Sequence, residues 1–375
     1  MTGLLVAVAI GAALGTLFHR GRICYASALS DSFLFGSSRT GGGILIATLA
    51  TTLAYGSVYA IRGDAGFYLT SWGWFSLVGG VVFGAGMILA GACLTSALWR
   101  AAIGRGQYAL VLSGVVAGFL ATASVQDALA RYYFAPLWLG GGRTLYGLEE
   151  ASAPLIALVV VAGTGVAYAA AVGSTKRRLG AGPSNAEGRR PAEALAVGGR
   201  TVVRSTLDYL GKWLSRPRLR DVVQRPWDPR TCGLGIAAVA TVWLLQYGAW
   251  TVSGPVERWL ALGVWTVEPG VLRAVPGLAS TFPGEVTPDM AVVTGFVGGA
   301  FLSSLATGDF EATPPTRRGS GAAVGGGLLM GCGAMLAPGC NVTNLYTGVA
   351  LLSVHGLLAG AGILLGSYLT TRSLF

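Results

Sequence analysis

The sequence predicts an all-α integral membrane protein of about nine transmembrane helices, with re-entrant half-helices in an inverted, pseudo-two-fold repeat. The first observation is composition: 53% of the 375 residues are hydrophobic, 11% are charged, and the mean hydropathy is +0.62. Soluble domains carry about 25% charged residues. The second observation is a pair of similar glycine-rich segments far apart in the chain, and the third is an uneven distribution of basic residues.

Nine apolar runs approach the roughly 20 residues with which a helix spans a bilayer. The first run has no basic segment before it and no clear cleavage site, so we expect a retained helix rather than a signal peptide. The chain also contains 59 glycines, which favour close helix packing and broken helices in a membrane. The nine predicted spans are residues 2–18, 41–61, 74–97, 107–126, 151–172, 232–253, 289–306, 319–340 and 354–371.

Basic residues predict the orientation of these spans. With the N-terminus outside and the C-terminus inside, 21 of the 26 lysines and arginines fall on the inner side, and residues 176–230 alone hold 13 of them. Cytoplasmic loops of membrane proteins carry such an excess. We therefore expect a multi-pass protein of the bacterial inner membrane with its N-terminus outside.

Segments 84–99 and 331–346 repeat one another, and each has a cysteine at the same point, Cys93 or Cys340. In the predicted orientation the first segment runs inward and the second outward, as in an inverted repeat. Pro338 costs a helix interior about 3 kcal/mol, so the helix should break beside the cysteine. Broken helices in transporters of this design surround the substrate near the middle of the membrane.

A helix that restarts at either cysteine directs free N–H groups at the cavity, which suits an anion. A buried thiol stays protonated and offers a weak donor with a polarisable sulfur. This chemistry matches a ligand with a soft, negatively charged sulfur better than one with hard oxygens only. The substrate-binding residues predicted around the two breaks are Cys93, Cys340, Gly91, Ala92, Thr95, Gly339 and Asn341.

The remaining cysteines and the two histidines are read separately. Cys24 follows the first span after two arginines, lies towards the inner side and has no counterpart in the second half of the sequence. Cys232 and Cys332 are expected to be packing residues. His19 and His355 lie at span ends, and without a Cys-x-x-Cys pair we predict neither a metal site nor a cofactor.

Three regions follow from these patterns. Residues 1–172 form the first membrane repeat plus a connector helix, and residues 232–375 form the second membrane repeat. Between them, residues 173–231 form a basic cytoplasmic loop, in which residues 192–214 favour an amphipathic helix on anionic membrane lipid. A docking site for a cytosolic partner is the alternative for this loop.

Three motifs together resemble the YeeE/YedE family of membrane proteins: Arg-Ile-Cys24, Leu-Ala-Gly-Ala-Cys93 and Leu-Ala-Pro-Gly-Cys340. The resemblance covers most of the chain outside the basic loop. It implies a transporter of sulfur metabolism that takes up thiosulfate, with an hourglass pathway along which Cys24, Cys93 and Cys340 contact the ion in turn. It also implies a TusA-like sulfur carrier as a possible cytoplasmic partner, on a separate chain because no Cys-Pro-x-Pro motif occurs here.

Alternatives to thiosulfate import stay open at this point. One is transport of another sulfur or selenium oxyanion, and another is a membrane thiol–disulfide redox protein, which the missing Cys-x-x-Cys disfavours. We expect no enzyme activity and no nucleic-acid partner. No acidic residue lies centrally in a predicted span, which leaves Asp31 and Asp289 as weak candidates for ion coupling.

Overall fold

The computed structural model describes residues 2–37, 39–63, 66–148 and 225–374. They form an all-α membrane protein whose described strands are one short antiparallel pair, β1 (Trp72–Gly73) with β2 (Trp138–Gly140). The fifth predicted span, 151–172, and the predicted basic loop up to residue 224 lie outside the described residues. Seven helical segments in the described part are long and apolar enough to cross a membrane.

The first half contains four long helices, α1, α3, α4 and α6, and several shorter ones. Their bounds are α1 Thr2–Arg20, α2 Tyr25–Phe35, α3 Arg39–Arg62, α4 Trp74–Leu89, α5 Leu94–Ala102 and α6 Gly106–Ser124, followed by the short α7 Gln126–Leu129, π-helix η1 Ala130–Phe134, α8 Ala135–Leu137 and 3₁₀-helix η2 Leu145–Leu148. The predicted third span is thus two helices, α4 and α5, with a break between them.

The second half also contains long and short helices. Its helices are α12 Pro229–Tyr247, α13 Ser253–Val267, α14 Pro269–Ala274, α15 Pro276–Thr281, α16 Pro288–Thr307, α17 Arg317–Leu336, the π-helix η4 Val342–Gly348 and α18 Val354–Leu374. Proline occupies the first turn of α12, α14, α15 and α16, where its missing N–H costs nothing.

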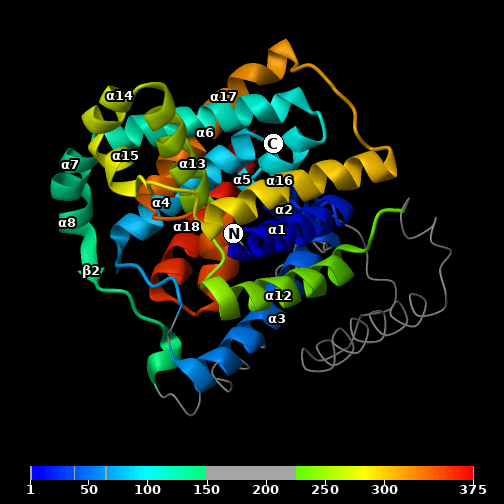
Figure 1. The fold of residues 1–375 in the computed structure, drawn as a ribbon, viewed down its shortest axis with the longest axis horizontal. Helices are drawn as coiled ribbons and strands as arrows, with labels where there is room; N and C mark the ends of the chain where they lie inside the picture. The colour runs from blue at the N-terminus through cyan, green and yellow to red at the C-terminus, as the bar shows by residue number, and fades with distance from the viewer. Residues whose placement is uncertain (1, 38, 64–65, 149–224, 375) are drawn as a thin grey trace.

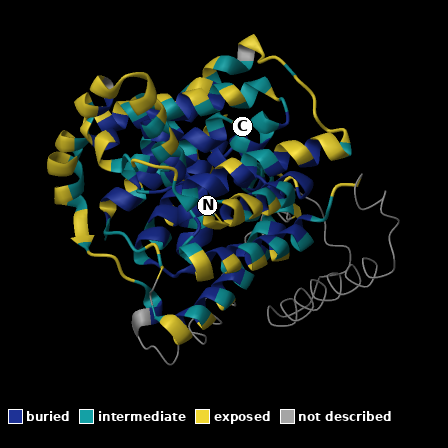
Figure 2. Cartoon of the chain, in the orientation of Figure 1, coloured by how far each residue is buried: buried dark blue, intermediate teal, exposed yellow. Residues whose placement is uncertain are grey.

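Long helices from opposite halves pack in pairs. In Figure 1, α1 lies beside α16 and α3 beside α12, while α4 packs on α18, α6 on α17, and α4 on α17 at the centre. Buried residues concentrate along these contacts, and exposed residues follow the periphery (Figure 2). Every pair therefore joins one half of the chain to the other.

Glycine allows these pairs to pack backbone against backbone, as two contacts illustrate. A Cβ atom added to Gly84 of α4 would overlap the carbonyl oxygen of Ile363 in α18. A Cβ atom added to Gly331 of α17 would overlap the carbonyl oxygen of Val115 in α6. Gly84 and Gly331 are matching positions of the repeated segments, so each segment makes an equivalent contact with the opposite half of the chain.

Candidate functional site

The first helix break lies between α4 and α5, at the place that the sequence predicts. Gly91 has φ +64, a left-handed conformation that favours glycine, and Ala92 is fully buried. Cys93 caps α5: its Sγ accepts a hydrogen bond from the Ser96 amide at 3.4 Å, and the Ser96 hydroxyl accepts one from the Cys93 amide at 3.0 Å. This reciprocal capping holds the thiol at the amino end of α5.

The second break lies between α17 and η4. Gly339 has φ +146, and the amide of Cys340 donates a 3.1 Å hydrogen bond to the hydroxyl of Ser253. The side-chain amide of Asn344 donates to the carbonyl oxygens of Ala337 (3.3 Å) and Gly339 (2.9 Å), which the broken helix leaves without amide partners. Here too the cysteine precedes a helix, although that helix is a π-helix.

Cys24 joins the first of these sites. It stands at the amino end of α2, and its Sγ donates a 3.2 Å hydrogen bond to the hydroxyl of Ser96. Cys24 and Cys93, 69 positions apart in the sequence, thus converge on one serine. Both thiols are fully buried.

Ser253 takes the corresponding place in the second site. It is the first residue of α13, and its hydroxyl lies 3.5 Å from the hydroxyl of Thr343. Thr343 follows Cys340 by three positions, as Ser96 follows Cys93, and lies 3.6 Å from the Cys340 Sγ. The sequence analysis did not identify Ser253 as a site residue, although Ser-Gly-Pro is a recognisable start of a helix.

Two predicted site residues carry buried polar atoms that find no hydrogen-bond partner within the described part of the chain. Thr95 and Asn341 are fully buried, and neither the Thr95 hydroxyl nor either amide atom of Asn341 has a hydrogen-bond partner among the described residues. Buried polar atoms are nearly always bonded, so each exception calls for an explanation. A bound polar ligand would supply the missing partners.

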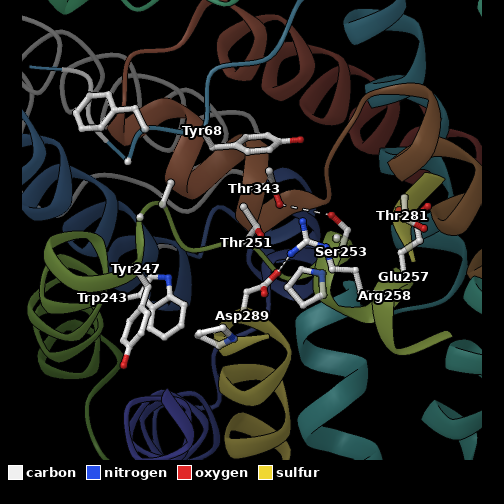
Figure 3. Close-up of a pocket in the computed structure, with 17 residues that line it drawn as sticks. Tyr68, Trp243, Tyr247, Thr251, Ser253, Glu257, Arg258, Thr281, Asp289 and Thr343 are labelled. Atoms are coloured by element: carbon white, nitrogen blue, oxygen red, sulfur yellow. Dashed lines mark hydrogen bonds and ion pairs between the residues drawn. The ribbon is translucent and has the colours of Figure 1, made fainter. Parts of the chain in front are cut away.

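A pocket of about 540 Å³, which we call the Ser253 pocket, leads to the second site. Figure 3 shows Ser253 and Thr343 facing one another, with Arg258 beside Asp289, its ion-pair partner. Tyr68 completes the wall near the break, where its hydroxyl donates to the Pro338 carbonyl at 3.4 Å. The pocket therefore ends one side chain away from Cys340.

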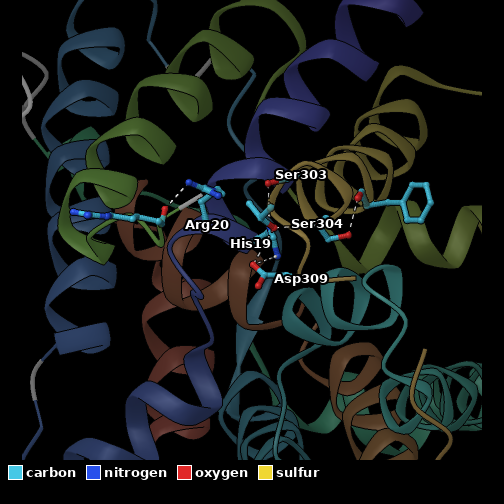
Figure 4. A network of polar contacts seen from close by, with 8 residues as sticks. His19, Arg20, Ser303, Ser304 and Asp309 are labelled. Atoms are coloured by element: carbon cyan, nitrogen blue, oxygen red, sulfur yellow. Dashed lines mark hydrogen bonds and ion pairs between the residues drawn. The ribbon is translucent and has the colours of Figure 1, made fainter. Parts of the chain in front are cut away.

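Basic and polar residues also lie where α1 and α5 end. His19, at the end of α1, bonds the hydroxyl of Ser303 at 2.9 Å and lies 3.7 Å from the Asp309 carboxylate (Figure 4). Arg100, in the last turn of α5, donates to the Tyr108 hydroxyl at 2.7 Å and lies over the Trp99 ring, 5.3 Å from its centroid. Arg100 thus places a positive charge in the last turn of α5, whereas Arg258 of the Ser253 pocket is paired with Asp289.

The two remaining cysteines lie apart from these sites. The Cys332 Sγ lies 3.6 Å from the carbonyl oxygen of Gly118 between α17 and α6, and Cys232 packs against the turn at Gly21. All five cysteines are unbridged. Across the part of the chain that the structure describes, no group of three or more His, Cys, Asp or Glu side chains could hold a metal ion.

Comparisons with known proteins find one matching family and several relatives. The family described as Sulphur transport matches residues 20–369. The thiosulfate transporter TsuA of Spirochaeta thermophila is 26% identical to this chain, over 100% of this chain and 98% of that protein. TsuA of Escherichia coli is 24% identical over 95% of this chain and 90% of that protein. The probable transporter YedE of Salmonella typhimurium is 30% identical over 39% of this chain and 37% of that protein.

Proposed function

Because this chain belongs to the sulphur transport family, we propose that it imports thiosulfate across the bacterial inner membrane through a cysteine-lined pathway. The family and the matched relatives are transporters rather than enzymes, which leaves the thiol–disulfide alternative without support. Both relatives that match this chain over nearly its whole length are named for thiosulfate. Another sulfur or selenium oxyanion remains the alternative substrate.

The proposed pathway runs from the Ser253 pocket past Cys340 and Cys93 to Cys24. The observation that carries it is the set of buried, unpartnered polar atoms on Thr95 and Asn341, because they lie directly after the two helix breaks. Oxygen atoms of the ion would accept from the hydroxyl and the amide. The neutral thiols would contact its outer sulfur weakly enough for the ion to move on.

The orientation proposed for this pathway places the Ser253 pocket outside. Tyr247, which lines the pocket, donates a 2.8 Å hydrogen bond to the carbonyl oxygen of Gly3 at the start of α1. Cys24 follows the other end of α1. With the N-terminus outside, the ion would meet Cys340 first and Cys24 last.

We propose further that the two membrane regions, 1–172 and 232–375, are related by an inverted repeat. The pairing of α4 with α18 and of α17 with α6 supports this, since the matching glycines Gly84 and Gly331 make the same backbone contact. The serine or threonine three positions after each cysteine supports it as well.

The basic region 173–231 would face the cytoplasm, on anionic lipid or beside a TusA-like carrier that accepts the sulfur. Its charge supports this placement, because 13 of the 26 basic residues lie between 176 and 230.

Growth tests the substrate. A sulfur-auxotrophic host that lacks its own thiosulfate uptake should grow on thiosulfate only with this gene, and labelled thiosulfate should accumulate in its cells. Excess selenite or sulfite should compete poorly. Growth that depends on the gene with selenite but not with thiosulfate would contradict the assignment.

Reporter fusions test the orientation. Fusions after residues 105 and 317 should read cytoplasmic, and a fusion near residue 143 or 270 that reads cytoplasmic would refute the orientation.

A further inference from the structure

The Ser253 pocket contains an acidic side chain that an anion site does not require. Glu257 lies one turn into α13 and lines the pocket on the side of Thr281 (Figure 3). Its Oε1 atom is buried and has no hydrogen-bond partner among the described residues. The predicted spans do not include residue 257, so sequence analysis did not count it among candidates for ion coupling.

Other charges in the pocket do not neutralise this carboxyl group. The titratable residues that line the pocket are Tyr68 from the segment before β1, Tyr247 from α12, Glu257 and Arg258 from α13, and Asp289 from α16. Arg258 is committed to an ion pair with Asp289. From α15, the Thr281 hydroxyl donates at 3.0 Å to its own helix, to the carbonyl oxygen of Leu278.

The protonation state of Glu257 therefore determines whether the pocket repels or binds an anion. As a carboxylate it would add an unpaired negative charge to a partly buried wall and repel a doubly charged ion. As a carboxylic acid it is neutral, and its O–H becomes a donor to an anion oxygen. Protonation of Glu257 therefore changes this part of the pocket from one that repels an anion to one that binds it.

We propose that Glu257 is a proton-binding site of this transporter, and that the anion enters the Ser253 pocket together with the proton that neutralises this side chain. This inference rests on the proposed function, because it presupposes that an anion passes through the pocket. It assigns a coupling ion to the transport. The proton also reduces the negative charge that must move towards a negative interior.

The electrostatics of the pocket place this protonation near neutrality. Burial raises the pKa of Glu257 to about 7, against the opposite influence of the neighbouring Arg258 and of the Thr281 hydroxyl. The acid form thus dominates below neutral pH and disappears above it. Thiosulfate itself stays doubly charged throughout this range.

Calorimetric binding of thiosulfate to the full-length purified protein tests the proposal. If only the acid form binds, affinity should fall about tenfold from pH 6 to pH 8, in proportion to the competent fraction. Glu257→Gln, which keeps the shape and stays neutral, should abolish this difference. Glu268→Gln is the matched control, because Glu268 is an exposed acid at the end of the same helix. It should keep the tenfold ratio.

Equal wild-type affinity at both pH values, or an unchanged ratio in Glu257→Gln, would overturn the proposal. A second measurement needs no substrate: infrared difference spectra should show one carboxylic acid band lost between pH 6 and pH 8 in wild type and missing in Glu257→Gln. If wild type binds no thiosulfate at either pH, the substrate assignment fails. The infrared titration then decides the proton site by itself, and absence of the band overturns it.

Discussion

Replacing Cys93 with serine separates the structural role of this residue from its role in transport. Cys93 is fully buried and caps α5 through a 3.4 Å contact from the Ser96 amide to its Sγ. Serine is among the preferred capping residues, and a good cap is worth about 1 kcal/mol over none. Because the thiol already caps weakly, Cys93→Ser should change the free energy of unfolding by no more than about 0.5 kcal/mol, in the stabilising direction.

Transport should respond in the opposite direction. The hydroxyl is harder than the thiol and matches the outer sulfur of the ion poorly. Loss of a soft contact worth about 1.4 kcal/mol would lower uptake about tenfold. Cys93→Ala should lose the cap as well as one buried atom, so its stability should fall by about 2 kcal/mol while uptake is mostly lost.

The assay combines thermal unfolding in detergent with thiosulfate uptake at matched membrane abundance. Cys332→Ser is the control, because this thiol contacts the Gly118 carbonyl between α17 and α6, away from the proposed pathway. It should transport like wild type. If Cys93→Ser also does so at equal abundance, the sulfur atom is not needed and the cysteine pathway is wrong.

Three further predictions follow from residues of the two breaks, of the helix pairs and of the basic loop. Thr95→Val removes a buried hydroxyl without a partner, so it should raise stability by about 1 kcal/mol while lowering uptake, in the same two assays. Gly331→Ala should lower the unfolding midpoint, costing about 1–3 kcal/mol against the Val115 carbonyl, whereas Gly325→Ala, with open space around its Cα, should not. Shortening residues 180–198 should leave uptake largely intact in a host with its carrier protein; complete loss at normal abundance would show that the loop gates or docks.

Sequence analysis located the two breaks because their signals are local. Gly91 and Pro338 interrupt apolar runs, and the repeated cysteines mark equivalent points. The α4–α5 break confirms the predicted restart at Cys93. After Cys340 the chain forms a π-helix instead of an α-helix, and no residue in Val342–Gly348 signals the wider turn.

The remaining parts of the candidate site depend on contacts between distant segments. The Cys24 thiol reaches Ser96 because the fold brings the amino end of α2 to the amino end of α5, which spacing along the chain does not reveal. Ser253 and Glu257 lie in α13, a helix of 15 residues that starts at the last residue of the predicted span 232–253 and ends before the next predicted span. Its apolar residues are too few for a span, although Pro255 in its first turn is a sign of helix initiation.

The backbone contacts between paired helices determine which parts of the molecule can move. Side chains adjust by changing rotamers, but a glycine pressed against a carbonyl oxygen has nothing to rotate. We therefore expect the long helix pairs to form a stiff frame, because such contacts occur in the α1–α16 pair as well as between α4 and α18 and between α6 and α17. The shorter helices α2 and α13, whose ends carry Cys24 and Ser253, pack against this frame. Along the proposed pathway we expect an ion to pass through side-chain rotation within nanoseconds and small shifts of short helices, rather than through a millisecond rearrangement of whole halves.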